Sequence, residues 1–322
     1  MKKRITLKGV GQVLKESFSH FGEDKITKLS GSLAYSTVFS IAPLLVVIIS
    51  LFGIFLGREA MEGKIYEQLN SFFGSNTAAQ LQETIKNASL SGKSKTAAII
   101  GSIILFIGAT AIFSEIQDSI NGIWGIKPKP KKGWLKFIRN RFLSFSVIVS
   151  LGFLLLVSLV VTSLIEAFNE KLQIWFPDIS IVIFYILNLI ITLAVVALIF
   201  GVIFKVLPDA DIQWKDVVFG ALFTAFLFML GKFGLTFYIS KSNIASSYGA
   251  AGSLVILLIW VYYSSVVLYF GAEFTKAWAI KFGEPIRPND YAVTVKKLDV
   301  ETGQSTVQEK EEKLTEVKTE NI

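Results

Sequence analysis

The sequence predicts an all-α polytopic membrane protein with six transmembrane helices and both termini in the cytoplasm, and three observations carry this prediction. The chain has 322 residues, of which 52% are hydrophobic and 18% charged, whereas about a quarter of a soluble domain is charged. Its apolar residues are gathered in runs long enough to cross a hydrocarbon core of about 30 Å. Between two of these runs, residues 126–141 carry seven Lys and Arg and no acidic residue, a pattern typical of cytoplasmic loops.

The composition also excludes several classes of function. There is no cysteine, so disulfides, thiolate metal sites and cysteine nucleophiles are excluded. The HExxH, Walker and GxSxG motifs are absent, and the single histidine leaves no histidine pair for acid–base chemistry on RNA. The net charge of +7 would fit a nucleic-acid partner, but membrane orientation alone explains basic residues beside spans. We therefore expect no catalytic residue, cofactor, metal or nucleic acid, and a lipid bilayer as the partner.

Residues 1–30 form a basic, amphipathic segment on the cytoplasmic side. One helical face gathers its apolar side chains, which are Leu7, Val10, Leu14, Phe18 and Phe21. Two interpretations stay open: a helix lying in the membrane interface, or a helix packed on loops of its own protein. His20 lies beyond the apolar face, and a lone histidine without a partner in sequence is expected at the surface.

Residues 31–280 are expected to form the transmembrane domain. The six predicted spans are residues 31–56, 97–120, 142–165, 179–204, 217–238 and 253–274. The polar connection 58–95 should lie outside and contain two short amphipathic helices, the second starting at the capping-box pattern Thr77-Ala78-Ala79-Gln80. Residues 281–322 have mixed charge and little apolar content, which predicts a disordered cytoplasmic tail.

The first two spans carry polar and small residues in stripes. In the first span the stripe consists of Ser32, Ser36, Ser40 and Pro43, with Tyr35 beside it. Pro43 removes a backbone donor and tends to kink a helix, whereas the serines could simply allow helices to approach closely. In the second span Gly101 and Gly108 form a close-packing stripe, and Glu115 and Asp118 lie on one face at its end.

The sixth span is expected to organise the rest of the bundle. Its residues Tyr262, Val266, Tyr269 and Glu273 recur at i, i+4, i+7 and i+11 and so share one helix face. A carboxylate is unfavourable in hydrocarbon and at the end of a span is either interfacial or paired. We therefore expect this face to point into the protein.

Three ordered motifs resemble those of a known family. They are LAYSTVFSIAPLLVV in the first span, the KVLP turn, and SYGAAGSLVILLIWVYYSSVVLYFGAE at the sixth span. Together they resemble the YihY/virulence factor BrkB family over roughly residues 10–285. The matching positions are Tyr35, Ser36, Ser40, Pro43, Lys205, Leu207, Pro208, Tyr248, Gly249, Gly252, Trp260, Tyr262, Gly271, Ala272 and Glu273.

The resemblance implies a six-span protein of the bacterial inner (plasma) membrane, in a family whose members often carry the label "ribonuclease BN". The residues give that label no support. We expect a transporter- or permease-like protein for a small solute or lipid in envelope physiology. A non-catalytic membrane scaffold acting through residues 127–141 or the tail is the alternative, followed by a membrane-tethered ribonuclease in tRNA processing. The ribonuclease would need a cluster of metal-binding carboxylates facing the cytoplasm.

Depth along the spans predicts where a functional surface lies. Glu115 comes 18 residues after Ala97, about 27 Å along the helix axis, and therefore sits near the cytoplasmic surface. Glu273 reaches the same depth in the sixth span, and Lys205 lies on an inner turn. We expect a polar vestibule facing the cytoplasm, unless these are ordinary interfacial charges and packing serines. Its residues would be Tyr35, Ser36, Ser40, Pro43, Glu115, Asp118, Lys205, Pro208, Tyr248, Tyr262 and Glu273.

Overall fold

A computed structural model of the chain describes residues 5–73, 75–89, 95–129, 142, 145–154, 177–242, 248 and 251–295. These residues are mostly helical. The longer helices are α1 (Leu7–Glu23), α2 (Ile26–Leu56), α3 (Arg58–Phe73), α4 (Ser75–Ser89), α5 (Lys95–Ile123), α7 (Pro177–Val206), α8 (Trp214–Lys241) and α10 (Gly252–Phe282). The strands are β1 (Ile126–Pro128), β2 (Ala210–Asp211), β3 (Arg287–Pro288) and β4 (Ala292–Thr294).

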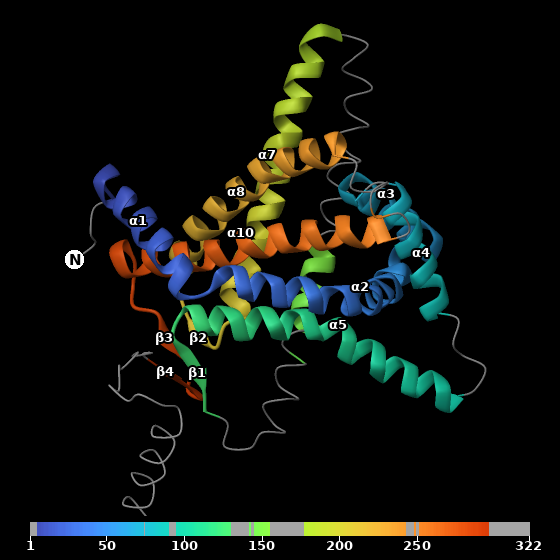
Figure 1. The fold of residues 1–322 in the computed structure, drawn as a ribbon, viewed down its shortest axis with the longest axis horizontal. Coiled ribbons are helices and arrows are strands. Elements are labelled where there is room, and N and C mark those ends of the chain that lie inside the picture. Colours follow the sequence, from blue (N-terminus) through green and yellow to red (C-terminus); the bar gives the residue numbers. More distant parts are fainter. Residues whose placement is uncertain are drawn as a thin grey trace, which may run out of the picture.

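Helix α10 is the central element of the bundle. It packs against α1, α2 and α8 and contacts α5, while α5 packs mainly on α2 and α7 packs on α8. In Figure 1, α2, α5 and α10 run side by side and α7 crosses them steeply. Half of the span in α10 is buried inside the protein, against a third or less in the other apolar spans. The sixth predicted span is therefore the central and most buried of the described spans.

Four described helices are long and apolar enough to cross a membrane. They are Ile26–Ser50, Ile186–Val206, Trp214–Ile239 and Gly252–Phe282, which correspond to the first, fourth, fifth and sixth predicted spans. The second predicted span lies within α5, a helix of 29 residues. In the third, Phe145–Leu154 is a short apolar helix, and residues 155–165 lie outside the described part of the chain. The structure thus confirms the helical class and describes four helices that could cross a membrane.

Helices α8 and α10 interlock through glycine and threonine. Gly220 faces Thr275 and Gly271 faces Thr224, so the pairs run antiparallel with matching spacing. At either glycine, an added Cβ would lie 2.8 Å from the Cβ of the facing threonine, closer than real Cβ atoms approach. Each threonine hydroxyl donates at 2.7 Å to the carbonyl of the glycine four residues before it in its own helix. Because neither glycine has a side chain, the two backbones come close enough to lock by shape.

The segment after α10 ties two loops together, which corrects the prediction of a disordered tail from residue 281. Helix α10 continues to Phe282, β3 pairs antiparallel with β2, and β4 pairs antiparallel with β1. Gly125 allows the turn before β1 with a φ of 66°, and its carbonyl accepts from Val295 N at 2.7 Å. Backbone hydrogen bonds between distant segments order these residues, and composition does not report such bonds. The rest of the tail, residues 296–322, lies outside the described residues.

The N-terminal helix packs on its own protein, the second of the two interpretations left open, although its partner is α10. Its buried residues are Gly9, Val13 and Ser17, while Leu7 is 94% exposed. The predicted apolar stripe is therefore split: Val10 and Leu14 pack beside Phe274 and Trp278, whereas Leu7 points outward. The centre of the Phe18 ring lies 4.8 Å from that of the Phe270 ring, although Phe18 is exposed.

The predicted connection between the first two spans contains two helices, as expected, and these are α3 and α4. The expected start of the second helix at Thr77 is wrong, since α4 begins at Ser75 and Thr77 is buried in its first turn. The Ser253 hydroxyl at the start of α10 donates to the side chain of Gln80 in α4. This hydrogen bond ties the start of α10 to the connection between the first two spans.

Candidate functional site

The C-terminal half of α10 meets the end of α1 at a group of ionisable side chains, which we call the charge cluster: Glu273 and Lys276 of α10, His20 of α1, and Asp24 after it. Glu273 is its centre, with a side chain that is 0% exposed. Glu273 Oε1 lies 3.0 Å from His20 Nδ1, and Glu273 Oε2 lies 3.2 Å from Lys276 Nζ. Lys276 Nζ also lies 3.9 Å from Asp24 Oδ2. The cluster therefore joins α10 to the end of α1 and the corner before α2.

The local sequence explains why α1 brings His20 to α10. The buried positions Gly9, Val13 and Ser17 lie on one face, and His20 continues that face at i+11. The helix then ends, and Asp24 N donates to His20 O at 2.9 Å. Lys25 has a φ of 52°, the left-handed conformation that turns the chain into α2. A tight corner thus holds Asp24 one turn beyond His20, facing α10.

Lys276 connects the cluster to the end of α5. Its Nζ donates to Ile123 O at 2.8 Å, where the last carbonyl groups of α5 have no partner within the helix. A cation at a helix C-terminus is favoured by the helix dipole. Beside it, Trp124 Nε1 donates to Ala272 O at 3.0 Å, so α5 and α10 are joined by two side-chain bonds. Lys276 therefore compensates Glu273, Asp24 and a helix terminus at once.

Sequence reasoning placed His20 at the surface and did not single out Asp24 or Lys276. The His20 side chain is 41% exposed, yet its Nδ1 atom is buried and faces Glu273. Nδ1 has no hydrogen-bond partner, yet its 3.0 Å separation from Glu273 Oε1 is within hydrogen-bond range and a small ring rotation could align the two groups. The feature of the sequence that could have predicted this contact is the face of α1 with the small residues Gly9 and Ser17, because small residues allow another helix to approach closely.

A second buried carboxylate, Asp209, holds the same end of the bundle together. Gln117 Nε2 donates to Asp209 Oδ1 at 3.1 Å, and Asn121 Nδ2 donates to Asp209 Oδ2 at 2.9 Å. Asn121 Oδ1 in turn accepts from Asp209 N at 2.8 Å, and Asp209 O accepts from Asn289 N at 3.0 Å. The sequence prediction did not include this group. Gln117 and Asn121, four residues apart on one face of α5, could have indicated a shared hydrogen-bond partner. We call this group the Asp209 cage.

Several residues of the expected vestibule do lie at this end of the bundle, but with separate partners. Glu115 Oε1 accepts from Ser32 Oγ at 2.7 Å, which ties α5 to α2. Lys205 Nζ donates to Asp211 Oδ1 at 2.8 Å and to Ile212 O at 2.6 Å. The Lys205 ammonium lowers the pKa of the Asp211 carboxyl below its usual value of 3.8 by hydrogen bonding and by charge. Lys205, the cation expected to pair with the carboxylates, thus binds Asp211, and the cation beside the buried Glu273 is Lys276.

The remaining vestibule residues are dispersed rather than gathered on one surface. Ser40 and Pro208 are buried, Ser36 is half-buried, and Asp118 is exposed. Pro43 lies against Gly108, where an added Cβ would be 3.0 Å from the proline ring, and α2 continues through it. Tyr35, Tyr248 and Tyr262 are exposed, so the face of α10 that holds Glu273 points inward only in its C-terminal half. The physical reason is that α1 and α5 enclose only that half.

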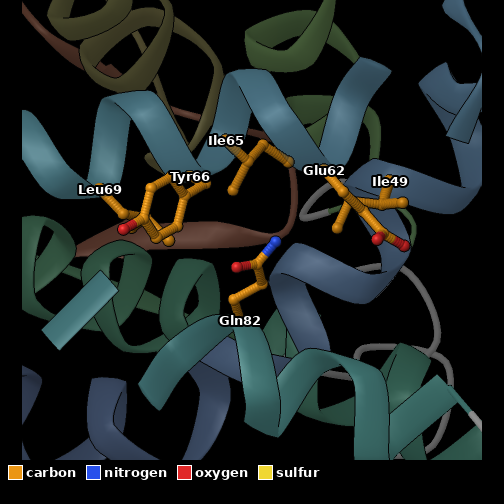
Figure 2. Close-up of a pocket in the computed structure, with 6 residues that line it drawn as sticks. All are labelled: Ile49, Glu62, Ile65, Tyr66, Leu69 and Gln82. Carbon is orange, nitrogen blue, oxygen red and sulfur yellow. The ribbon is translucent and has the colours of Figure 1, made fainter. Parts of the chain in front are cut away.

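A small hollow lies at the opposite end of the bundle. It is lined by Ile49, Glu62, Ile65, Tyr66, Leu69 and Gln82, from α2, α3 and α4 (Figure 2). Its cavity volume of about 10 Å³ holds no more than about one water molecule, far below the roughly 300–1,000 Å³ of sites that enclose small-molecule ligands. Among the described residues, no three His, Asp or Glu side chains are placed to hold a metal ion. The charge cluster is therefore the candidate site with the most chemical content.

Comparison with known proteins gives the chain a family. Residues 17–292 match the family model described as Virulence factor BrkB. A UPF0761 membrane protein of Haemophilus influenzae (strain 86-028NP) is 28% identical over 274 residues, covering 84% of this chain and 94% of the relative. A UPF0761 membrane protein of Pseudoalteromonas translucida (strain TAC 125) is 31% identical over 260 residues, covering 79% and 81%. No solved structure matches the chain. The three motifs and the family match agree, and the chain belongs to the virulence factor BrkB family of membrane proteins.

Proposed function

We propose that this protein crosses the bacterial inner membrane six times, with both termini in the cytoplasm, and moves a small solute or a lipid without catalysing a reaction. The observation that carries the proposal is Glu273, a fully buried carboxylate on the central helix, paired with His20 and Lys276. Ionisable groups inside membrane-spanning helices are unfavourable, and they commonly mark substrate or ion pathways.

The energetics favour a functional role over a structural one. Taking an ion pair out of water costs several kcal/mol per ion, and well-packed apolar residues of similar volume often stabilise a protein equally or better. The neighbouring face of α10 shows that this bundle can pack α-helices through glycine, threonine and aromatic side chains alone. Helix packing therefore does not require four ionisable groups at the junction with α1, and a role in handling ions or solutes explains them.

The proposed orientation follows from charge and from the arrangement of the helices. The ends of α5, α7 and α10 lie with the starts of α2 and α8, and the short strands join their loops (Figure 1). Residues 126–129, the described start of the basic loop, lie at this end of the bundle. A cysteine at Lys129 should be protected from an impermeant reagent in spheroplasts, whereas one at Glu62 should be labelled. Labelling of position 129 alone would reverse the orientation.

The transport proposal can be tested without knowing the substrate. Proteoliposomes with and without the protein would be compared for uptake and release of a broad mixture of solutes and lipids. We expect wild type to move at least one species, and Glu273→Gln to lower that rate by about tenfold or more. Glu16→Gln, a substitution of an exposed carboxylate of α1 outside the cluster, is the matched control and should retain the rate. A species moved equally by wild type and Glu273→Gln would remove the cluster from the mechanism.

The absence of catalysis is part of the proposal and has its own test. Among the described residues, Glu115, Asp118 and Glu273 do not form a group that could hold a metal ion, and Glu115 is bound by Ser32 and Glu273 by Lys276. The purified protein should therefore not process RNA above the background of a mock preparation. Cleavage by wild type that disappears when all three carboxylates are changed to alanine would make the protein a ribonuclease.

A further inference from the structure

We propose that Glu273 and His20 form a proton-binding site, and that His20 connects the buried carboxylate to the aqueous side of the membrane. Three features of the charge cluster support the proton site: the decreasing solvent exposure from Glu23 to Glu273, the positions of the two imidazole nitrogens, and the net charge of the cluster. A role of this site in coupling transport to protons also rests on the function proposed above.

The three acid–base groups are arranged from water to the interior. Glu23 is 69% exposed, His20 is 41% exposed and Glu273 is 0% exposed. The two ring nitrogens of His20 face different carboxylates: Nε2 lies 3.9 Å from Glu23 Oε2, and Nδ1 lies 3.0 Å from Glu273 Oε1. An imidazole that faces water with one nitrogen and a buried carboxylate with the other has the geometry of a proton shuttle.

The charges of the cluster leave room for one proton. Glu273 and Asp24 contribute two negative charges, and Lys276 contributes one positive charge. With a neutral imidazole the cluster therefore carries one net negative charge in a site that is largely removed from water. A single proton, on Glu273 or on His20, brings the sum to zero. Because burial disfavours uncompensated charge, the cluster is built to hold that proton.

The groups around Glu273 come from several elements. Helix α1 provides His20 and Glu23, the corner provides Asp24, and α10 itself provides Lys276. On the α5 side, Glu115 and Ser119 lie beside Tyr269, a fully buried residue one turn before Glu273, and the Ile123 carbonyl fixes Lys276. Glu115 is already bound by Ser32 Oγ, which leaves His20 as the half-exposed group in direct reach of Glu273.

The transfer step is balanced without any other reactant. His20 starts neutral with its proton on Nδ1, after the small ring rotation that aligns this N–H with Glu273 Oε1. Nε2 then accepts a proton from the aqueous side, and the Nδ1 proton passes to Oε1. Glu273 becomes a neutral carboxylic acid, and the imidazole is left neutral with its proton on Nε2. Return of the proton by the same route restores the starting state.

The proton on Glu273 can be measured by infrared difference spectroscopy of the full chain in lipid nanodiscs, without any solute. Acidification should produce the carbonyl band of a buried carboxylic acid in wild type, and this band should be lost in Glu273→Gln. Exchange into deuterated water should shift the band at least tenfold more slowly in His20→Gln than in wild type. Glu23→Gln should slow this shift less than His20→Gln does.

The single histidine gives an independent readout. With isotope-labelled histidine and a purification tag that lacks histidine, the ring-nitrogen signals belong to His20 alone. We expect them to change from the Nδ1–H to the Nε2–H tautomer as the infrared band appears.

If Glu273→Gln does not fold, the His20→Gln exchange rate and the ring-nitrogen signals still test the proposal. A band that persists in Glu273→Gln, no band in wild type, or exchange unaffected by His20→Gln would overturn the proposal. If the protein binds the proton but transports nothing, the proton site stands and the transport function fails. If it transports a species but binds no proton at Glu273, the proton site fails and the transport function stands.

Discussion

The two faces of α10 hold their neighbours in different ways. Toward α8, Gly271 and Thr275 meet Thr224 and Gly220 in close van der Waals contact. Toward α1, Glu273 and Lys276 meet His20 and Asp24 through charge, at distances of 3.0 to 3.9 Å. Both faces are buried, and they lie within six residues of one another on the same helix. The first we call the interlocked face and the second the charged face.

The comparison shows where this bundle can change its structure. Contacts between closely packed backbones depend on shape and are insensitive to pH, whereas the balance of the charged face changes with a single proton. The α8–α10 pair is therefore expected to act as a fixed unit, with α1 and the corner before α2 as the part that responds. The predictions below test this contrast, from the largest expected effect to the smallest.

The interlocked face should be broken most severely by a side chain at Gly220. Even the first carbon of the new side chain would lie 2.8 Å from Thr275 Cβ, so Gly220→Leu must separate α8 from α10. Overpacking of a core costs about 1–3 kcal/mol and occasionally more, and we expect about 3 kcal/mol or more here. Thermal unfolding in detergent measures the loss. Gly234→Leu is the matched control, since Gly234 has no atom within 4 Å of an added Cβ. Equal losses would show that α8 and α10 do not interlock in the membrane.

The charged face should be broken next most severely by removing its ammonium group. Lys276→Met leaves Glu273 and Asp24 without their cation, and breaking a buried pair costs about 3–5 kcal/mol. Because Lys276 is 22% exposed, we expect the low end of that range, measured by the same unfolding assay. Glu273→Gln leaves Asp24 and Lys276 balanced and should cost much less. A larger loss for Glu273→Gln than for Lys276→Met would contradict the charge count.

The Asp209 cage tests whether a buried carboxylate held by neutral amides behaves like the charged face. Asp209→Asn replaces one accepting oxygen by an amide that opposes the donors of Gln117 or Asn121. An unsatisfied buried group costs about 1–3 kcal/mol, and we expect a loss in that range. Hydrogen exchange at residues 287–294 should rise, because Asp209 O accepts from Asn289 N at the end of β3. Unchanged exchange there would mean that the strands hold without the cage.

The smallest effect is expected from the surface pair of Lys205 and Asp211. Lys205 lowers the pKa of Asp211 in the folded protein, so the pair stabilises the fold above the usual pKa of 3.8 and this contribution is lost as pH falls through the lowered pKa. Asp211→Asn should therefore lower the Tm slightly at neutral pH and not at all in strong acid. Asp211 is exposed, and the difference should shrink at high salt. A difference that grows in acid would have the wrong sign.

Much of the fold could be read from the sequence. Long apolar runs predicted the helices, since in a membrane every backbone polar group must be satisfied within its own segment, and a helix does this locally. Depth counting also placed Glu115, Lys205 and Glu273 at one end of the bundle, where the structure has them. Depth counting could not predict which residues contact one another, because the rotation of each helix about its axis decides which neighbour a side chain faces. Glu115 thus binds Ser32, Lys205 binds Asp211, and Glu273 faces residues of α1.

The sequence by itself determined the membrane class, the positions of the helices and the family, because each depends on composition, periodicity or motifs along the chain. Tertiary structure alone decided that His20 and Asp24 meet Glu273, that Gly220 receives Thr275, and that residues 287–294 pair with distant loops. The reason is physical: each of these contacts joins segments that lie far apart in the chain. Burial, charge pairing and backbone approach between such segments exist only after the helices have packed.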